Sequence, residues 1–133
     1  MGDTPRDVVE SFFAKMSEGG TARESVGELF RDDATISLPG ATFSGSSAAN
    51  DFLQFLAPRY EWADKSFDRW IETGNEVISI GTLYGETNAG AEFTDVRYID
   101  VYTIDPNTGL IARLDIWNDL AVDAVVSIGE AGQ

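Results

Sequence analysis

Apolar residues in the first sixty positions recur at intervals of three and four, the spacing of one face of an α-helix. The first such stripe predicts a helix that begins after Thr4 and stops at Gly19-Gly20. Thr4 suits the N-cap, Pro5 the first helical position, and Asp7 completes a capping box. The stripe consists of Val8, Val9, Phe12, Phe13 and Met16.

Two shorter stripes predict two further helices. A capping box at residues 21–24 opens the second helix, which carries apolar side chains inward. Ser46 or Ser47 caps the third helix, and Pro58 ends it. Between the second and third helices, residues 34–38 predict a short strand.

From about residue 66 the pattern changes to the two-residue alternation of β-strands. Turns rich in glycine, asparagine and aspartate separate four strands, at residues 66–72, 77–87, 96–104 and 110–120. Three helices followed by an antiparallel meander predict a single α+β domain over residues 1–133. The three N-terminal helices must cover one face of a curved antiparallel sheet, and the wedge between them is the natural place for a cavity.

The strand at residues 96–104 contains the best candidate for chemistry. Because side chains alternate along a strand, one face holds Val96, Tyr98, Asp100, Tyr102 and Ile104. A carboxylate among rings is costly unless it is paired or its pKa is raised. Two interpretations of Asp100 stay open. It is either a proton-transferring catalytic residue, or a structural carboxylate bonded to a tyrosine hydroxyl or to Lys65 or Arg69 of a neighbouring strand.

Alternation in the last strand predicts an inward set and an outward set of side chains. The inward set is Ala112, Leu114, Ile116, Asn118 and Leu120. The outer sheet face would hold Ile99, Val101, Ile111 and Trp117, and we expect a homodimer to form through it. A one-residue slip or bulge after Gly109 would instead turn Asp115 inward, since register decides the face.

The charge balance limits the classes of molecule that the protein is expected to bind. The chain carries 23 acidic residues against nine basic ones, a formal net charge of −14. Such a surface repels phosphate backbones and anionic membranes, so we expect no nucleic-acid partner and no membrane partner. No apolar run approaches the ~18 residues of a transmembrane helix. The N-terminus lacks the pattern of a signal peptide, which favours a cytoplasmic protein.

The sequence has no cysteine and no histidine. This excludes disulfides, thiol catalysis, histidine relays and the usual zinc sites. The acidic pair Asp32-Asp33 is typical of a solvated corner, and we expect no metal site and no cofactor. Acid–base work therefore falls to aspartate, glutamate, tyrosine or lysine.

Five short motifs stand in a characteristic order: residues 8–13 (VVESFF), 29–35 (LFRDDAT), Gly45, 98–100 (YID) and 109–119 (GLIARLDIWND). In this order they resemble the nuclear transport factor 2-like superfamily, the cone-shaped, cystatin-like fold of ketosteroid isomerase and of the SnoaL-like polyketide cyclases. The resemblance covers nearly the whole chain and implies a central cavity between helices and sheet. It implies no single activity, because the fold carries isomerases, cyclases, dehydratases, epoxide hydrolases and binding modules.

The resemblance carries over few site residues. Ketosteroid isomerases use a strand aspartate, a helix tyrosine and a base after the first strand, and these positions fall on Asp100, Phe12 and Leu38. Limonene-epoxide hydrolases need charges on the strand at residues 77–84, which has none. Polyketide cyclases use an inward aspartate on the last strand, where Ile116 stands. The usual steroid isomerase and epoxide hydrolase residue sets are therefore incomplete.

Together these patterns favour a cofactor-independent small-molecule enzyme: an isomerase, cyclase, dehydratase or hydrolase. Asp100 would act by acid–base catalysis on a hydrophobic, cyclic substrate. Tyr98, Tyr102 and Asn118 would position the substrate, although aromatic strand residues also serve as core and Asn118 would equally suit a cap. The remaining pocket residues would be Phe12, Leu38, Leu114, Ile116, Trp70 and Tyr60. The alternative is a non-catalytic module that binds a ligand or partner through the cavity or the outer sheet face.

Overall fold

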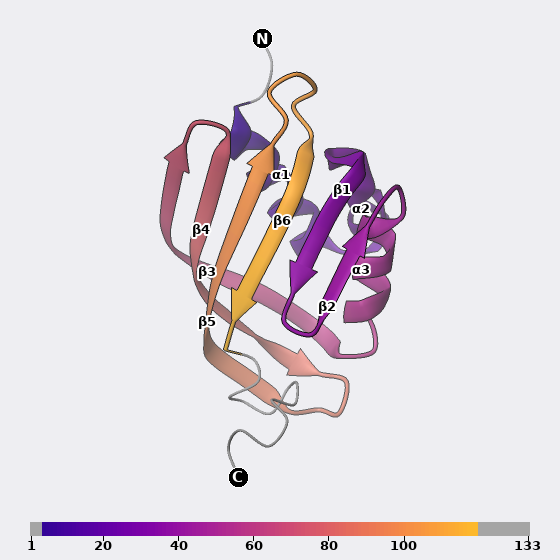
Figure 1. The fold of residues 1–133 in the computed structure, drawn as a ribbon. Helices are drawn as coiled ribbons and strands as arrows, with labels where there is room; N and C mark the ends of the chain where they lie inside the picture. The colour runs from indigo at the N-terminus through magenta and orange to yellow at the C-terminus, as the bar shows by residue number, and fades with distance from the viewer. Residues whose placement is uncertain (1–3, 120–133) are drawn as a thin grey trace.

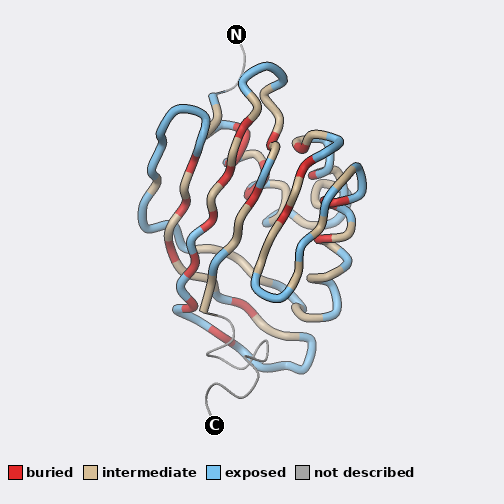
Figure 2. Tube along the Cα trace, in the orientation of Figure 1, coloured by how far each residue is buried: buried red, intermediate tan, exposed pale blue. Residues whose placement is uncertain are grey.

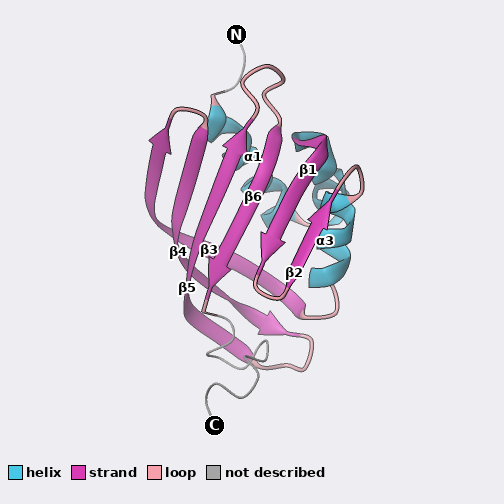
Figure 3. Ribbon diagram, in the orientation of Figure 1, coloured by secondary structure: helices cyan, strands magenta, loops and turns pink. Residues whose placement is uncertain are grey.

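The computed structural model describes residues 4–119 of the 133-residue chain (Figures 1 and 3). The helices are α1 (Pro5–Glu18), α2 (Gly20–Glu24), a 3-10 turn η1 (Ser25–Leu29) and α3 (Ala48–Leu56). The strands are β1 (Phe30–Leu38), β2 (Ala41–Ser44), β3 (Tyr60–Thr73), β4 (Glu76–Thr87), β5 (Glu92–Ile104) and β6 (Ile111–Asn118). All the helices lie on one side of the sheet, behind it in Figure 1. The predicted α+β class, with helices on one face of a curved sheet, is confirmed.

The strands join one sheet in the order β2-β1-β6-β5-β4-β3. The predicted meander of β3 to β6 is antiparallel throughout, and so is the short hairpin of β1 and β2. The pairing of β1 with β6 is parallel, so the sheet is mixed rather than purely antiparallel. Parallel neighbours need a long connection, and here the chain between them contains α3 and four strands.

The N-terminal helix begins as the sequence predicts. The Asp7 backbone N–H donates to Thr4 Oγ1 and the Thr4 backbone N–H donates to Asp7 Oδ2, each at 3.1 Å. The capping box predicted at residues 21–24 is wrong: α2 starts at Gly20 and no side chain caps it. Ser47 stands at the N-cap of α3 but gives no capping hydrogen bond to the helix backbone.

The buried core lies between the helices and the concave face of the sheet, and buried residues follow the middle of the central strands (Figure 2). From α1 it receives Val8, Val9, Phe12 and Phe13, which pack on Tyr102 and Leu114 of the sheet. Burial of these large apolar side chains is the main stabilising contribution of such a domain. No helix within residues 4–119 is both long and apolar enough to span a membrane.

β3 is longer than predicted and pairs with β4 along its whole length. The two strands approach closely at Gly81, where an added Cβ would overlap the backbone carbonyl oxygen of Ser66. Bulges interrupt their register between Tyr60 and Trp62 and between Phe67 and Arg69. Bulges bend and twist a strand, so β3 curves toward the helix side. The first half of β3 contacts α1 through Asp64, whose carboxylate accepts a hydrogen bond from Ser17.

The last strand confirms one part of the predicted alternation and corrects another. Leu114, Ile116 and Asn118 pair with the inward residues of β5, as expected. Ala112, also predicted inward, has no partner in the β5 register, and Leu120 lies outside the described residues. Ile111 is not on the outer face: it is fully buried opposite Ile104, because a bulge follows Thr103 in the β5–β6 register. Asp115 remains on the outer face opposite Val101, and Arg113 Nε donates to its carboxylate at 2.9 Å.

Candidate functional site

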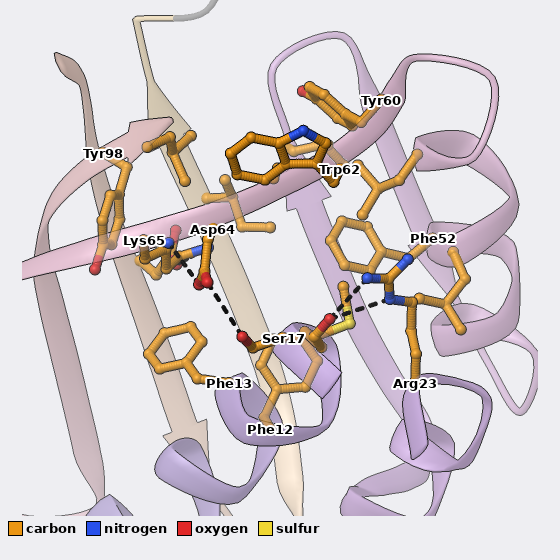
Figure 4. A pocket seen from close by; sticks show the side chains of 18 of the residues that line it. Phe12, Phe13, Ser17, Arg23, Phe52, Tyr60, Trp62, Asp64, Lys65 and Tyr98 are labelled. Atoms are coloured by element: carbon orange, nitrogen blue, oxygen red, sulfur yellow. Dashed lines mark hydrogen bonds and ion pairs between the residues drawn. The ribbon is translucent and has the colours of Figure 1, made fainter. Parts of the chain in front are cut away.

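A cavity of about 900 Å³ lies between the concave sheet face and the helices α1 and α3 (Figure 4). Its walls are mostly apolar and aromatic. They include Phe12, Phe13, Leu38, Phe52, Leu56, Tyr60, Trp62, Phe67, Trp70, Tyr98, Tyr102, Ile116 and Asn118. A few polar side chains interrupt this surface, and the carboxyl of Asp100 is the most deeply buried of them. The volume falls within the range of small-molecule sites.

The alternation of side chains along β5 turns Asp100 toward the cavity. It lies in the centre of β5, opposite Ser79 of β4 and Ile116 of β6, and its exposed fraction is 3%. Burial raises the pKa of its carboxyl from 3.8 to about 6, while the charge of Lys65 and the neighbouring Tyr102 hydroxyl offset part of that rise. At neutral pH this group is close enough to its pKa to accept or release a proton.

Lys65 reaches Asp100 from the first half of β3. Its Nζ lies 3.8 Å from Asp100 Oδ2, which is an ion-pair contact rather than a short hydrogen bond. The same ammonium lies 5.1 Å from the ring centre of Phe13 and 5.0 Å from that of Tyr98. Two aromatic rings and one carboxylate therefore surround the cation. Figure 4 shows Lys65 with Phe13 and Tyr98 at the cavity wall.

Two tyrosines complete the polar end of the cavity. The hydroxyls of Tyr98 and Ser79 share a hydrogen bond of 2.8 Å. Burial raises the pKa of Tyr98 to about 12, and burial with the nearby Asp100 carboxylate raises that of Tyr102 as well. Both phenols stay protonated at neutral pH and are available as donors. Within residues 4–119, the Tyr102 hydroxyl is the one buried side-chain polar atom without a well-formed hydrogen bond.

A second polar region lies at the end of α1 (Figure 4). The guanidinium of Arg23 donates to the Met16 carbonyl oxygen at 2.8 and 3.2 Å. Ser17 Oγ donates to Asp64 Oδ2 at 3.2 Å and so links α1 to β3. These groups already have partners within the protein, so they shape the cavity wall more than its chemistry.

The structure brings most of the predicted site residues to one cavity. Asp100, Tyr98, Tyr102, Asn118, Phe12, Leu38, Ile116, Trp70 and Tyr60 all line it. Leu114 does not line it: this side chain is fully buried in the core, opposite Tyr102 on the neighbouring strand. The prediction missed Phe13 and Ser79, and left Lys65 as one of two cations that would suit Asp100. Ser79 lies directly across the sheet from Asp100, which only the register of β4 and β5 reveals.

Metal ligands do not gather in the described part of the chain. No group of three or more histidine, cysteine, aspartate or glutamate side chains lies together among residues 4–119 in an arrangement that would hold a metal ion. Around Asp100 the cavity offers one buried carboxyl, the ammonium of Lys65 and the phenols of Tyr98 and Tyr102, next to a largely apolar space. This set suits proton transfer to and from a mostly apolar molecule.

A model of the SnoaL-like domain family matches residues 9–114. The chain belongs to this family. Solved structures agree with the nuclear transport factor 2-like fold that the motifs predict. No curated protein matches the chain.

Three solved structures illustrate the kinds of protein whose fold is similar to that of this chain. A nuclear transport factor 2-like protein of unknown function from Burkholderia pseudomallei K96243 has a TM-score of 0.81 at 14% identity, over 95% of this chain and 99% of its own. A putative SnoaL-like polyketide cyclase from Shewanella denitrificans OS-217 has a TM-score of 0.76 at 14% identity, over 90% and 93%. A hypothetical protein with a ketosteroid isomerase-like fold from Catenulispora acidiphila DSM 44928, in complex with trimethylamine, has a TM-score of 0.74 at 19% identity, over 90% and 89%. Because these structures share only 14 to 19% sequence identity with the chain, the similarity shows a common fold and nothing further.

Proposed function

We propose that this SnoaL-like protein is a cofactor-independent enzyme that moves a proton on a hydrophobic, cyclic small molecule, with Asp100 as the acid–base residue. The observation that carries the proposal is a single buried carboxyl at the inner end of a largely apolar cavity, with its pKa raised to about 6. General bases work best when their pKa lies near the operating pH. The family likeness to a putative polyketide cyclase and a ketosteroid isomerase-like fold is consistent with this chemistry.

In this proposal the ionised Asp100 accepts a proton from a carbon or hydroxyl of the bound molecule. The protonated carboxyl then returns it to another atom of the same molecule. Tyr98 and Tyr102 stay neutral and act as hydrogen-bond donors that orient the polar end of the substrate. The aromatic walls from Phe12, Phe13 and Trp70 favour flat rings. Isomerisation, cyclisation and dehydration all consist of such proton transfers.

The test is proton exchange with solvent. A panel of apolar cyclic ketones and hydroxy-ketones is incubated with the protein in D₂O, and deuterium uptake is followed by mass spectrometry. We expect protein-dependent uptake by at least one compound and its loss in Asp100→Asn, which keeps the shape of the side chain without its basicity. Asp68→Asn, which removes the same charge from an exposed part of β3, is the matched control. If Asp100→Asn exchanges as fast as the wild type, the proposal is wrong.

A non-catalytic ligand-binding module is the alternative, and the ion pair of Lys65 with Asp100 is the observation that favours it. A carboxylate held permanently by an ammonium would serve structure and not proton transfer. Trp62 and Trp70 line the cavity, so binding is measurable by their fluorescence. Compounds that bind but show no solvent exchange and no chemical change would support this alternative.

We also infer a homodimer through the outer face of β5 and β6. Ile99 and Trp117 are cross-strand neighbours there, with exposed fractions of 43% and 62%. Exposed apolar side chains that adjoin one another are typical of protein contacts. Trp117→Asp is expected to convert a dimer into a monomer in sedimentation velocity. A wild type that sediments as a monomer at all concentrations would contradict the inference.

A further inference from the structure

Lys65 lines the cavity next to Asp100, and the proposed proton transfer assigns it no role. Three cations line the cavity within the described residues: Arg6, Arg23 and Lys65. Arg23 is bonded to a backbone carbonyl, and Arg6 forms ion pairs with carboxylates at 3.1 and 3.5 Å, outside the Asp100 cluster. The partner of Lys65 is different, because Asp100 is the group whose charge disappears when it accepts a proton.

We propose that Lys65 is a catalytic residue that exchanges its partner: it pairs with the Asp100 carboxylate at rest and with a negatively charged oxygen of the ligand once Asp100 is protonated. This inference rests on the proposed function and assigns its second charged group. The ligand class is a molecule whose oxygen carries or develops a negative charge on loss of a proton, such as an enolisable ketone or a phenol.

The charge balance of the step supports this role. When Asp100 removes a proton from carbon, the C–H bond breaks, a carboxylic O–H bond forms, and the electron pair moves through the carbonyl to leave an enolate oxygen. Before the step the Lys65–Asp100 pair consists of one ammonium and one carboxylate, and after it the ammonium faces one neutral carboxyl and one enolate. Creating an isolated charge in an apolar site is costly, whereas moving a negative charge from one partner of the same cation to another is not.

The geometry leaves Lys65 able to make this exchange. Its separation from Asp100 Oδ2 is 3.8 Å, longer than a charge-assisted hydrogen bond of 2.7 to 2.9 Å. Its side chain lines the cavity and keeps an exposed fraction of 25%, whereas that of Asp100 keeps 4%. A lysine ammonium on its four-carbon stem is a movable point charge, and the flanking rings of Phe13 and Tyr98 provide attraction without fixing one direction.

Among residues 4–119, Lys65 is the charged group that acts on the Asp100 carboxyl. On its own strand the titratable neighbours are Tyr98 and Tyr102, which burial keeps protonated. The neighbouring strands place Ser79 and Ile116 opposite it. On the helix side α1 contributes Phe13, so Lys65 of β3 is the cation of this cluster. Binding of an anionic oxygen should therefore depend on the protonation of Asp100 alone in the range around pH 6.

The test uses 4-nitrophenol, a phenol that is ionised at pH 8, and reads binding from the fluorescence of Trp62 and Trp70. At pH 8 Asp100 of the wild type is ionised and competes for Lys65. Asp100→Asn imitates the protonated state, so we expect it to bind the phenolate up to about 100-fold more tightly, as two pH units above a pKa of about 6 imply. For the wild type, affinity for the anion should fall about tenfold per pH unit above this pKa.

The decisive comparison is made within the Asp100→Asn background. Adding Lys65→Met should weaken phenolate binding roughly 10- to 100-fold, the contribution of a hydrogen bond to a charged group. Lys65→Arg should retain most of it. The chain has one other lysine, Lys15, whose ammonium donates to Ser25 Oγ at 2.8 Å outside the cavity. Lys15→Met removes the same charge and should leave binding unchanged.

These results separate the inference from the proposed function. If Asp100→Asn binds the phenolate no better than the wild type, or if adding Lys65→Met changes nothing, the inference is overturned even when solvent exchange depends on Asp100. If phenolate binding behaves as expected but no compound exchanges protons, the proposed enzyme fails while the anion site stands. If exchange occurs, Lys65→Met should slow it roughly 100- to 1,000-fold, as loss of one oxyanion donor does.

Discussion

The buried carboxyl of Asp100 should make the protein less stable as the pH rises through the weakly acidic range. In the folded chain its pKa is about 6, against 3.8 for the free side chain. Between these values the unfolded chain has lost the proton and the folded chain still holds it, so the free energy of unfolding falls with pH. The difference of about two pKa units corresponds to a destabilisation of about 3 kcal/mol above pH 6.

Urea unfolding at pH 4 and at pH 7.5 measures this effect. The wild type has 23 acidic residues, so its own pH dependence is not informative, but the difference between wild type and Asp100→Asn cancels the other groups. We expect Asp100→Asn to gain roughly 2 to 3 kcal/mol relative to the wild type between pH 4 and pH 7.5. Asp68→Asn removes an exposed carboxylate and is the control; it should show no comparable gain.

Equal pH dependence of the wild type and Asp100→Asn would refute the reasoning. It would mean that the carboxyl is solvated or ion-paired as well in the fold as in the unfolded chain. A titration of the Asp100 side-chain carboxyl carbon by NMR gives the same quantity directly, with Asp100→Asn to assign the signal. A midpoint near 3.8 would agree with that negative result, whereas a midpoint near 6 would agree with the unfolding data.

Three further measurements test the packing and charges around the site. Lys65→Met should raise the pKa of Asp100 further above 6, because the ammonium holds it down; an unchanged NMR midpoint would contradict the ion pair. Gly81→Ala should lower the free energy of unfolding by more than ~2 kcal/mol, because its Cβ would overlap a backbone carbonyl of β3. Wild-type stability in urea would show that the strands can separate there. Thr4→Ala should cost about 1 kcal/mol by removing the capping box of α1, measured by thermal unfolding; no change would mean that the cap does not hold in solution.

Local patterns predict those parts of the fold that depend on local physics. The capping box of Thr4 and the strand centred on Asp100 follow from residue spacing, and the structure reproduces both. The parallel pairing of β1 with β6 joins strands that are far apart in the chain, and the sequence of neither strand indicates it. The buried position of Ile111 depends on a bulge opposite Thr103, which one strand's sequence does not contain.

The site was predictable to the same extent. Strand parity alone turned Asp100 inward among rings, so the candidate carboxyl was identifiable. The choice between Lys65 and Arg69 as its cation was not, because both come from the same strand. The bulge between Phe67 and Arg69 reverses which side chains face inward, and it places Arg69 opposite Ile80, whose β5 partner is the exposed Ile99.

The raised pKa of the buried Asp100 carboxyl favours a role in chemistry over a role in holding the fold. A carboxyl whose raised pKa implies a loss of about 3 kcal/mol in the free energy of unfolding at neutral pH is not expected to stabilise the fold, since an apolar side chain opposite Ile116 would pack without that loss. The ion pair with Lys65 lessens the cost without removing it, because the pKa remains raised in its presence. A buried carboxylate whose pKa is raised despite its ion pair is suited to accept a proton from a ligand. In the proposed exchange, protonation of Asp100 would remove this cost and would free Lys65 to pair with another oxygen.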